Sequence, residues 1–279
     1  MYPQGTTRRA LVLGAGGVVG TAWMAGLAAG LPDSGIDLAD SDVFVGTSAG
    51  AIIGALLATG ERPERLAALP PTTGHPHVPD PAVLAEVFAV LSEPGQDATV
   101  ARRRVGQLAR TTDVAGPHTQ IDRMRGLLGT TRFPERLLVT AVDADTGEPV
   151  VWDGDSDIPL PQAVAASTAF PGVSPPIPIG GRYYMDGGLR SATNADLATD
   201  ADTLVVVEPL AHLFPPEQLR QELTATRATT VVTLRPDAAA ITAFGTDPYD
   251  RAVWADAYRA GKRQSIDAAE RLRHLGTGG

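Results

Sequence analysis

VFVGTSAGAIIGALL, at residues 43–57, is the stretch from which the organisation of the whole chain can be understood. Its first three residues are apolar and favour β structure, so they predict a short buried strand. From Ala49 onward the residues are small or aliphatic, and no charge occurs before Glu61, which predicts a buried helix. Between the two lies a G-x-S-x-G sequence with Ser48 at its centre. A serine at the corner between a strand and a helix is the setting of a nucleophile elbow.

Ser48 is the candidate nucleophile because this corner suits its chemistry. Its hydroxyl would be held free on a strained turn, where glycine at positions 46 and 50 removes the Cβ atoms that would clash. The helix that follows would point its free N–H groups and its positive dipole end at an oxyanion formed at Ser48. The alternative is a glycine-rich turn that matches the motif by chance, but it does not account for the strand and helix on either side.

Composition limits both the fold and the class of function. A chain of 279 residues can form one large α/β domain or two small ones. Its formal net charge of −9 leaves no broad basic face, which argues against a nucleic-acid partner. The chain has no cysteine, which excludes a disulfide scaffold, a thiol nucleophile and a thiolate metal site.

The amino-terminal region can be interpreted either as a membrane-directed segment or as part of the folded domain. Arg8 and Arg9 precede an uncharged run at residues 10–32, which superficially resembles a signal peptide or a spanning helix. Six glycines interrupt the run and lower its helix propensity. It divides more naturally into a strand, a glycine turn and a helix, so we expect a cytoplasmic protein.

The glycine turn, GAGGVVG at residues 14–20, exposes consecutive backbone N–H groups that could bind an anion. A dinucleotide fingerprint would need glycine where the chain has Val19, and it would need an acidic residue at the end of the second strand, where there is none. The alternative is an oxyanion hole, in which these N–H groups meet the carbonyl oxygen of a group held at Ser48.

Residues 61–129 differ from their surroundings, because a proline-rich segment is followed by three amphipathic patterns. We expect a helical insertion that flanks or covers the site, with helices near residues 82–92, 98–111 and 119–128. His75, His77 and Asp80 have the spacing of a metal cluster, but they lie among prolines with no further ligand nearby. We therefore expect a surface loop there and no metal.

The second half of the chain alternates strands with helices, which indicates an α/β fold with a mostly parallel sheet. A final helix is predicted from Asp247 as N-cap, with Pro248 in its first turn, to about Leu275. The expected strands lie at residues 136–142, 149–152, 182–185, 203–208 and 230–235.

A nucleophilic serine needs a base, and two arrangements are open. Asp186-Gly187-Gly188 ends a strand and could project its carboxylate into a crowded site, although Asp-Gly suits a tight turn equally well. A Ser–Asp–His triad requires a histidine after the acid, and His212 and His274 fulfil that order. Prolines on both sides of His212 favour a surface connection, and His274 lies at the end of a helix near the carboxyl terminus.

Taken together, the motifs make the chain resemble the patatin-like phospholipase family. GAGGVVG, GTSAG and DGG occur in the family's order, and AASTAFP at residues 165–171 and RYYMDGG at 182–188, with Asn194 beyond, extend the likeness. The resemblance implies a patatin-like three-layer α/β sandwich with a mostly parallel central sheet and the helical insertion at 61–129. We expect one domain over residues 8–279 and a disordered tail over residues 1–7.

The resemblance also assigns roles to residues. It makes Ser48 the nucleophile and Asp186 its partner in a dyad, and it forms the oxyanion hole from the N–H groups of Gly16, Gly17 and Val18. It implies a lipid acyl-ester substrate, transient contact with a membrane surface, and neither cofactor nor metal. Family members often carry Arg or Lys where this chain has Val19. That departure motivates the alternative of a catalytically weak lipid-binding protein on the same fold, and a Ser–Asp–His esterase is a further alternative.

Overall fold

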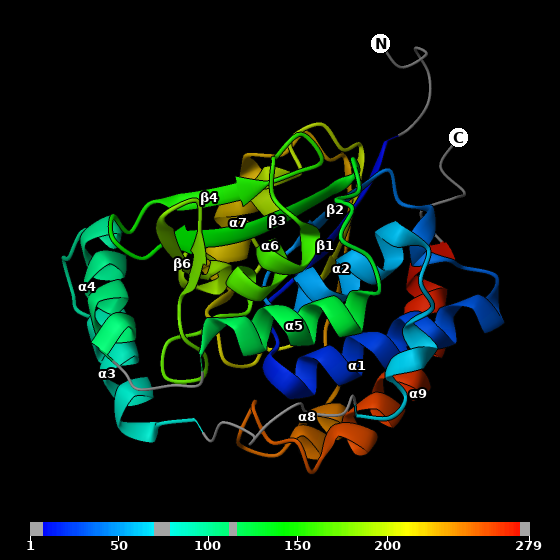
Figure 1. Cartoon of the computed structure of the whole chain (residues 1–279). Coiled ribbons are helices and arrows are strands. Elements are labelled where there is room, and N and C mark those ends of the chain that lie inside the picture. Colours follow the sequence, from blue (N-terminus) through cyan, green and yellow to red (C-terminus); the bar gives the residue numbers. More distant parts are fainter. Residues whose placement is uncertain (1–7, 70–78, 112–115, 274–279) are drawn as a thin grey trace.

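A central sheet of eight strands organises the structure (Figure 1), a computed structural model that describes residues 8–69, 79–111 and 116–273. The strands are β1 (Arg9–Leu13), β2 (Val43–Gly46), β3 (Leu137–Asp143), β4 (Pro149–Trp152), β5 (Ile177–Ile179), β6 (Arg182–Asp186), β7 (Thr203–Val207) and β8 (Thr230–Leu234). Their order is β5-β6-β3-β2-β1-β7-β8, with β4 paired to β3. The five strands from β3 to β8 in this order are parallel, and β4 and β6 run antiparallel to β3. The mostly parallel α/β sheet expected from the sequence is confirmed.

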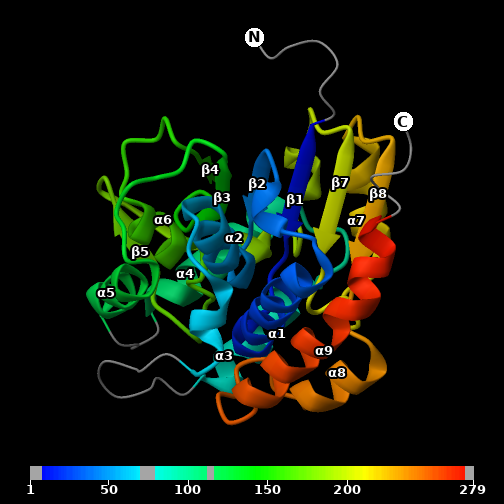
Figure 2. The same cartoon turned by 90° about the vertical axis from the view of Figure 1, so that its right-hand side faces the viewer.

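Helices cover both faces of this sheet (Figures 1 and 2). They are α1 (Gly17–Gly30), α2 (Ala49–Thr59), α3 (Pro81–Leu91), α4 (Ala98–Thr111), α5 (Pro117–Leu128), α6 (Leu160–Ser167), α7 (Pro216–Thr224), α8 (Ala238–Phe244) and α9 (Trp254–Arg273). Alternate residues of each central strand point to opposite layers. In β1, Leu11 and Leu13 join the large core under α1, α2, α5, α6, α8 and α9, while Ala10 and Val12 join a smaller core under α7.

The uncharged run at residues 10–32 folds as predicted into β1, a glycine turn and α1. Helix α1 is buried along almost its whole length because it packs against α9. The indole Nε1 of Trp23 donates to the side chain of Gln264 on α9 at 3.2 Å. No helix in the described ranges is both long enough and apolar enough to cross a membrane.

The insertion forms three helices close to the predicted bounds, but they do not form one unit. Helices α3 and α4 pack on each other and on the far end of β3, where Val142 and Met185 join their apolar residues. Helix α5 instead packs against α6. The predicted loop residues His75 and His77, and the tail at residues 1–7, lie outside the described residues. Asp80 caps α3 by accepting hydrogen bonds from the N–H groups of Ala82 and Val83.

The final helix was predicted to begin at Pro248, and this is wrong, because α9 begins at Trp254. A helix from Pro248 would need its carbonyl to accept the N–H of Ala252. That N–H instead binds the side chain of Asp250 at 2.8 Å, and the Pro248 carbonyl accepts from Val18 at 2.8 Å. Local side-chain bonds of this kind compete with helix formation. Helices α7 and α8, which the sequence did not predict, precede this segment.

The pairing along β3 brings two distant strand ends together. Strand β4 pairs with β3 from Val139 to Val142 and occupies one edge of β3. Strands β2 and β6 pair with some of the same β3 residues, so both of them must lie along the opposite edge. On that edge β2 ends with Gly46 opposite Val139, and β6 arrives from the other direction and ends with Asp186 opposite Ala141. The end of β2 and the end of β6 therefore face each other.

Candidate active site

The corner after β2 has the strained geometry expected of a nucleophile elbow. Ser48 adopts φ 54° and ψ −118°, and a positive φ is rare for a residue with a side chain. A Cβ added to Gly50 would lie 1.9 Å from the carbonyl oxygen of Leu13, and one added to Gly46 would lie 2.6 Å from the Cα of Ala51. Neither position could hold a larger residue without moving β1 or α2, which explains the glycines on either side of the serine.

Ser48 and Asp186, which lie 138 residues apart in sequence, meet at this corner. The hydroxyl of Ser48 donates to Oδ2 of Asp186 at 2.7 Å, and the N–H of Gly188 donates to Oδ1 at 2.7 Å. Both side chains are buried, with exposed fractions of 8% and 2%. The two acceptor oxygens of the carboxylate thus have one partner each, and one of these is the Ser48 hydroxyl.

Residues of α6 and the loop after it support this pair. The N–H of Ser48 donates to Oγ of Ser167 at 2.9 Å, and the N–H of Asp186 donates to the carbonyl of Ala169 at 3.0 Å. Both supporting residues belong to the AASTAFP segment. The sequence showed the segment but not what it does: it contacts the nucleophile through a side chain and the acid through its backbone.

Burial makes the carboxyl of Asp186 a stronger base than an aspartate in water. Loss of solvation raises the pKa of Asp186 from 3.8 to about 7, although the hydrogen bonds from Ser48 and Gly188 lower it in part. Desolvation penalises the charged form of a carboxyl group. A base is most effective when its pKa lies close to the working pH. Near neutral pH this carboxylate can accept the proton of Ser48.

The glycine-rich loop before α1 supplies only part of the expected anion site in this conformation. The N–H of Val18 donates to the carbonyl of Pro248 at 2.8 Å, as does that of Val19 at 3.2 Å, so the amide of Val18 is occupied. Within the described ranges, the N–H groups of Gly16 and Gly17 donate to no other group. Gly17 has φ 58°, and a Cβ there would lie 2.6 Å from the Pro248 oxygen. The amide of Val18 is not open in this conformation, and its place in the oxyanion hole stays a prediction.

No described histidine takes part in the pair. His212 is exposed in a turn after β7, and its ring lies 6.5 Å from that of Phe244. His118 is exposed on α5, and the other histidines lie outside the described residues. In the described part of the chain, Asp186 is the only titratable group hydrogen-bonded to the Ser48 hydroxyl. No group of His, Cys, Asp and Glu suited to a metal ion occurs in that part either.

Aromatic side chains from three distant segments line up beside the pair. The ring of Phe170, next to Ala169, lies 6.0 Å from Phe88 of α3 and 6.4 Å from Tyr249 in the segment before α9. Burial and the negative charges of Asp186 and Asp247 raise the pKa of the Tyr249 hydroxyl, which keeps it neutral. No motif marked Tyr249 or Phe88, because only the fold brings them to Phe170.

Known proteins resemble this chain in sequence. A family model described as patatin-like phospholipase matches residues 11–199. An uncharacterized NTE family protein of Mycobacterium tuberculosis is 28% identical over 213 residues, which cover 75% of this chain and 31% of that protein. The chain thus spans less than a third of the length of this curated relative.

Two solved structures match the chain at low identity. VipD from Legionella pneumophila matches with a TM-score of 0.46 and 14% identity, over 95% of this chain and 67% of that one. ExoU from Pseudomonas aeruginosa, in its complex with SpcU, matches with a TM-score of 0.41 and 19% identity, over 96% of this chain and 52% of that one.

Proposed function

The chain belongs to the patatin-like phospholipase family, and from this premise we propose that it is a serine-dependent hydrolase of lipid acyl esters. The observation that carries the proposal is the 2.7 Å hydrogen bond from Ser48 to a buried carboxylate whose pKa is raised to about 7. A nucleophile on a strained corner with its base in contact is the arrangement that covalent catalysis requires.

The proposed reaction has two halves. In the first, Oγ of Ser48 attacks the ester carbonyl while its proton passes to Oδ2 of Asp186, and the tetrahedral intermediate then expels the alcohol, which takes that proton. In the second, Asp186 accepts a proton from water, the resulting hydroxide attacks the acyl-enzyme, and the fatty acid leaves as Ser48 regains its proton. Each half restores the carboxylate, so no group is consumed.

The developing oxyanion needs donors, and Gly16 and Gly17 carry the two open amides of the loop. Such donors act only where negative charge forms, and losing one costs roughly 3 kcal/mol in the barrier. Val18 joins them only in a conformation in which the carbonyl of Pro248 has left its N–H. The segment before α9 therefore controls how complete the oxyanion hole is.

The apolar surroundings support a fatty-acyl substrate. The row Phe88, Phe170 and Tyr249 begins beside Asp186 and ends at the half-exposed ring of Phe88 on α3, which gives an acyl chain an aromatic wall to lie against. Phospholipid, lysophospholipid and neutral esters all share this acyl part. We propose that the surface around Phe88 makes transient contact with a membrane, from which such substrates are drawn.

A second candidate is a lipid-binding protein with weak catalysis. It is favoured by Val19, which lacks the charge often found there in the family, and by the occupied amide of Val18. The two candidates share the fold and differ in turnover.

Labelling with a fluorophosphonate probe and turnover of p-nitrophenyl acyl esters separate them. We expect the wild type to be labelled once and to hydrolyse the esters, and Ser48→Ala to lose both properties. Ser92→Ala, an exposed serine at the end of α3, is the matched control and should keep both. Labelling that persists in Ser48→Ala would assign the chemistry to another residue, and a wild type that is neither labelled nor active favours the binding protein.

A further inference from the structure

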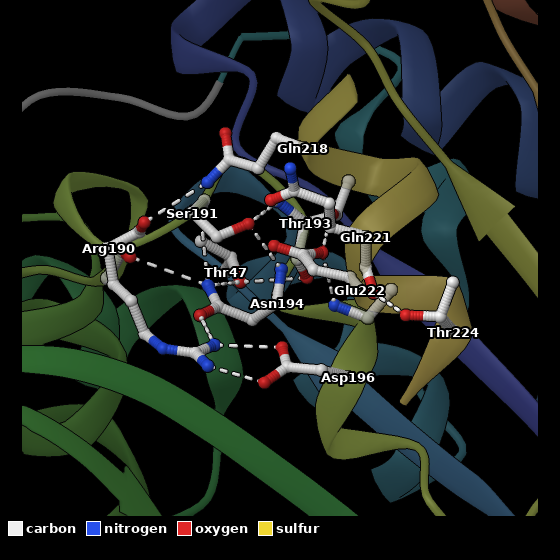
Figure 3. A network of polar contacts seen from close by, with 12 residues as sticks. Thr47, Arg190, Ser191, Thr193, Asn194, Asp196, Gln218, Gln221, Glu222 and Thr224 are labelled. Carbon is white, nitrogen blue, oxygen red and sulfur yellow. Dashed lines mark hydrogen bonds and ion pairs between the residues drawn. The ribbon is translucent and has the colours of Figure 1, made fainter. Parts of the chain in front are cut away.

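A buried asparagine connects the two loops that carry the catalytic pair. Asn194 is fully buried, with an exposed fraction of 0%, and its backbone is left-handed at φ 54°. Its amide nitrogen donates to Oγ1 of Thr47 at 3.0 Å, to the carbonyl of Ser191 at 2.9 Å and, at 3.4 Å, to that of Gly187 (Figure 3). Thr47 precedes Ser48, and Gly187 follows Asp186. One side chain thus reaches a neighbour of each reacting residue.

Thr47 is held from a second direction as well. Oγ1 of Thr140, on β3, lies 3.0 Å from Oγ1 of Thr47, and the hydroxyl of Thr47 lies 3.4 Å from the carbonyl of Thr193. Thr140 occupies the position on β3 between the ends of β2 and β6. The residue before the nucleophile is therefore tied both to the sheet and to the loop that contains Asn194.

Ionic contacts hold that loop on its outer side (Figure 3). Arg190 donates to the side-chain oxygen of Asn194 at 2.6 Å and forms a two-bond ion pair with Asp196. On α7, Glu222 accepts from the hydroxyl of Thr193 at 2.5 Å and from the N–H of Ala195 at 2.9 Å. The bonds of Glu222 support the loop without reaching Thr47, Gly187 or the side chain of Asn194, so they offer a control for the stability of the loop.

We propose that Asn194 is a positioning residue that holds the nucleophile elbow and the Asp186 loop at the separation at which Ser48 meets its base. The inference rests on the proposed function, and it adds a residue that touches neither the substrate nor the reacting atoms. A buried amide without this role would need only to satisfy nearby carbonyls, as the bond to Ser191 does. The bond to Thr47 is different, because it joins segments that lie 147 residues apart.

Asn194→Gly removes the side chain and keeps a residue that tolerates the left-handed backbone. Asn194→Asp keeps an acceptor for Arg190 and loses the donor. Because the bonds to Thr47 and Gly187 disappear in both variants, we expect kcat to fall about 10- to 100-fold in both, with KM changed less than about twofold. The pH at which activity reaches half its maximum should also rise, because a weakened bond from Ser48 no longer lowers the pKa of Asp186.

Glu222→Ala is the matched control, since it removes two bonds from the outer side of the same loop. It should lower the melting temperature as Asn194→Gly does and leave kcat and the pH profile unchanged. If Asn194→Gly does not fold, Thr47→Val removes the other partner of the same bond, and it should show the same fall in kcat at constant KM. The proposal would be overturned if folded Asn194→Gly or Thr47→Val kept the kcat and pH profile of the wild type. It would also be overturned if Glu222→Ala showed the same kinetic changes as they do.

A crystal structure of the variant gives a readout that does not depend on turnover. We expect Oγ of Ser48 and Oδ2 of Asp186 to move beyond hydrogen-bond distance in Asn194→Gly and to stay in contact in Glu222→Ala. An unchanged contact in Asn194→Gly would refute the positioning role. If the wild type shows no turnover that depends on Ser48, the proposed function fails, and this distance still decides the role of Asn194.

Discussion

At the scale of single residues, the buried carboxyl of Asp186 couples activity to pH. Only the ionised form can accept the proton of Ser48, and burial raises the pKa of this group to about 7. We therefore expect kcat/KM to increase about tenfold per pH unit at acidic pH and to level off above neutrality. Initial rates on a p-nitrophenyl ester between pH 5 and 9 measure this. A plateau that already begins near pH 5 would contradict the raised pKa.

The same residue should oppose stability. A carboxyl whose pKa is higher in the folded state than in the unfolded state binds its proton more tightly when folded, so stability falls as the pH rises between the two values. A pKa shift from 3.8 to about 7 corresponds to about 4 kcal/mol in the free energy of unfolding, and the protein loses this stability as the pH rises from 4 to 7. Asp186→Asn removes the charge, so we expect it to be inactive yet more stable than the wild type at pH 8, with little difference at pH 4. Urea unfolding at both pH values checks this, and equal stability of the two proteins at pH 8 would be the contrary result.

The sequence marked the proposed reacting residues more clearly than the residues that form hydrogen bonds with them. Ser48 could be found because its glycines and flanking elements are local, and Asp186 because it ends a strand before two glycines. The occupied amide of Val18 and the bond from Asn194 to Thr47 depend on contacts between segments far apart in the chain. No local pattern records such contacts, so neither the bond from Val18 to Pro248 nor the bond from Asn194 to Thr47 was predicted.

At the scale of elements, the close approach of α1 and α9 should be sensitive to a single methyl group. A Cβ on Gly261 of α9 would lie 2.0 Å from the carbonyl oxygen of Trp23 on α1, so Gly261→Ala must push the helices apart. We expect this variant to lose about 1–3 kcal/mol of folding stability. Gly126 on α5 has no atom within 4 Å of its Cβ position. Gly126→Ala should instead stabilise the protein by about 0.5–1 kcal/mol, since alanine favours a helix.

Chemical denaturation of these two alanine variants beside the wild type tests the packing directly. The expected changes have opposite signs although the substitution is the same. Stabilisation by both would show that helix propensity rather than contact between α1 and α9 determines the result, and destabilisation by both would contradict the open space at Gly126.

Helix boundaries show where local signals suffice. Apolar spacing within the helix placed α3, α4 and α5 close to their observed bounds. The capping signal of Asp247 and Pro248 misplaced the start of α9, because the carbonyl of Pro248 binds the loop before α1 and Asp250 accepts the N–H of Ala252. A capping signature indicates that a helix can begin at a residue, and hydrogen bonds with other segments determine whether it does begin there.

At the scale of the whole molecule, the proposed acyl wall combines α3, the loop after α6 and the segment before α9. Phe88 has an exposed fraction of 53% and stands at the outer end of the aromatic row. We expect medium and long acyl esters to be preferred over acetate, and Phe88→Ala to raise KM for long esters by about tenfold while leaving acetate unchanged, because only a long chain reaches that ring.

Ile266→Ala, which removes an apolar residue of α9 with an exposed fraction of 62%, serves as the control for general loss of surface hydrophobicity. It should leave the chain-length profile unaltered. Rates on a series of p-nitrophenyl esters from two to sixteen carbons provide the comparison. An enzyme that prefers acetyl esters would contradict a lipid substrate and the assignment of the wall.

The arrangement of β2 and β6 on one edge of β3 has a consequence for how such a site can vary. The contact between Ser48 and Asp186 is set by the ladder of β6 on β3, where Asp186 stands opposite Ala141. A slip of one residue would move the acid by about 3.4 Å and turn it to the other side of the sheet. A change of register therefore removes the base from the site altogether, whereas the bonds of Asn194 act on the separation within one register. Changes in turn length that preserve this ladder keep Asp186 on the side of the sheet that faces Ser48, and changes that break the ladder take it away.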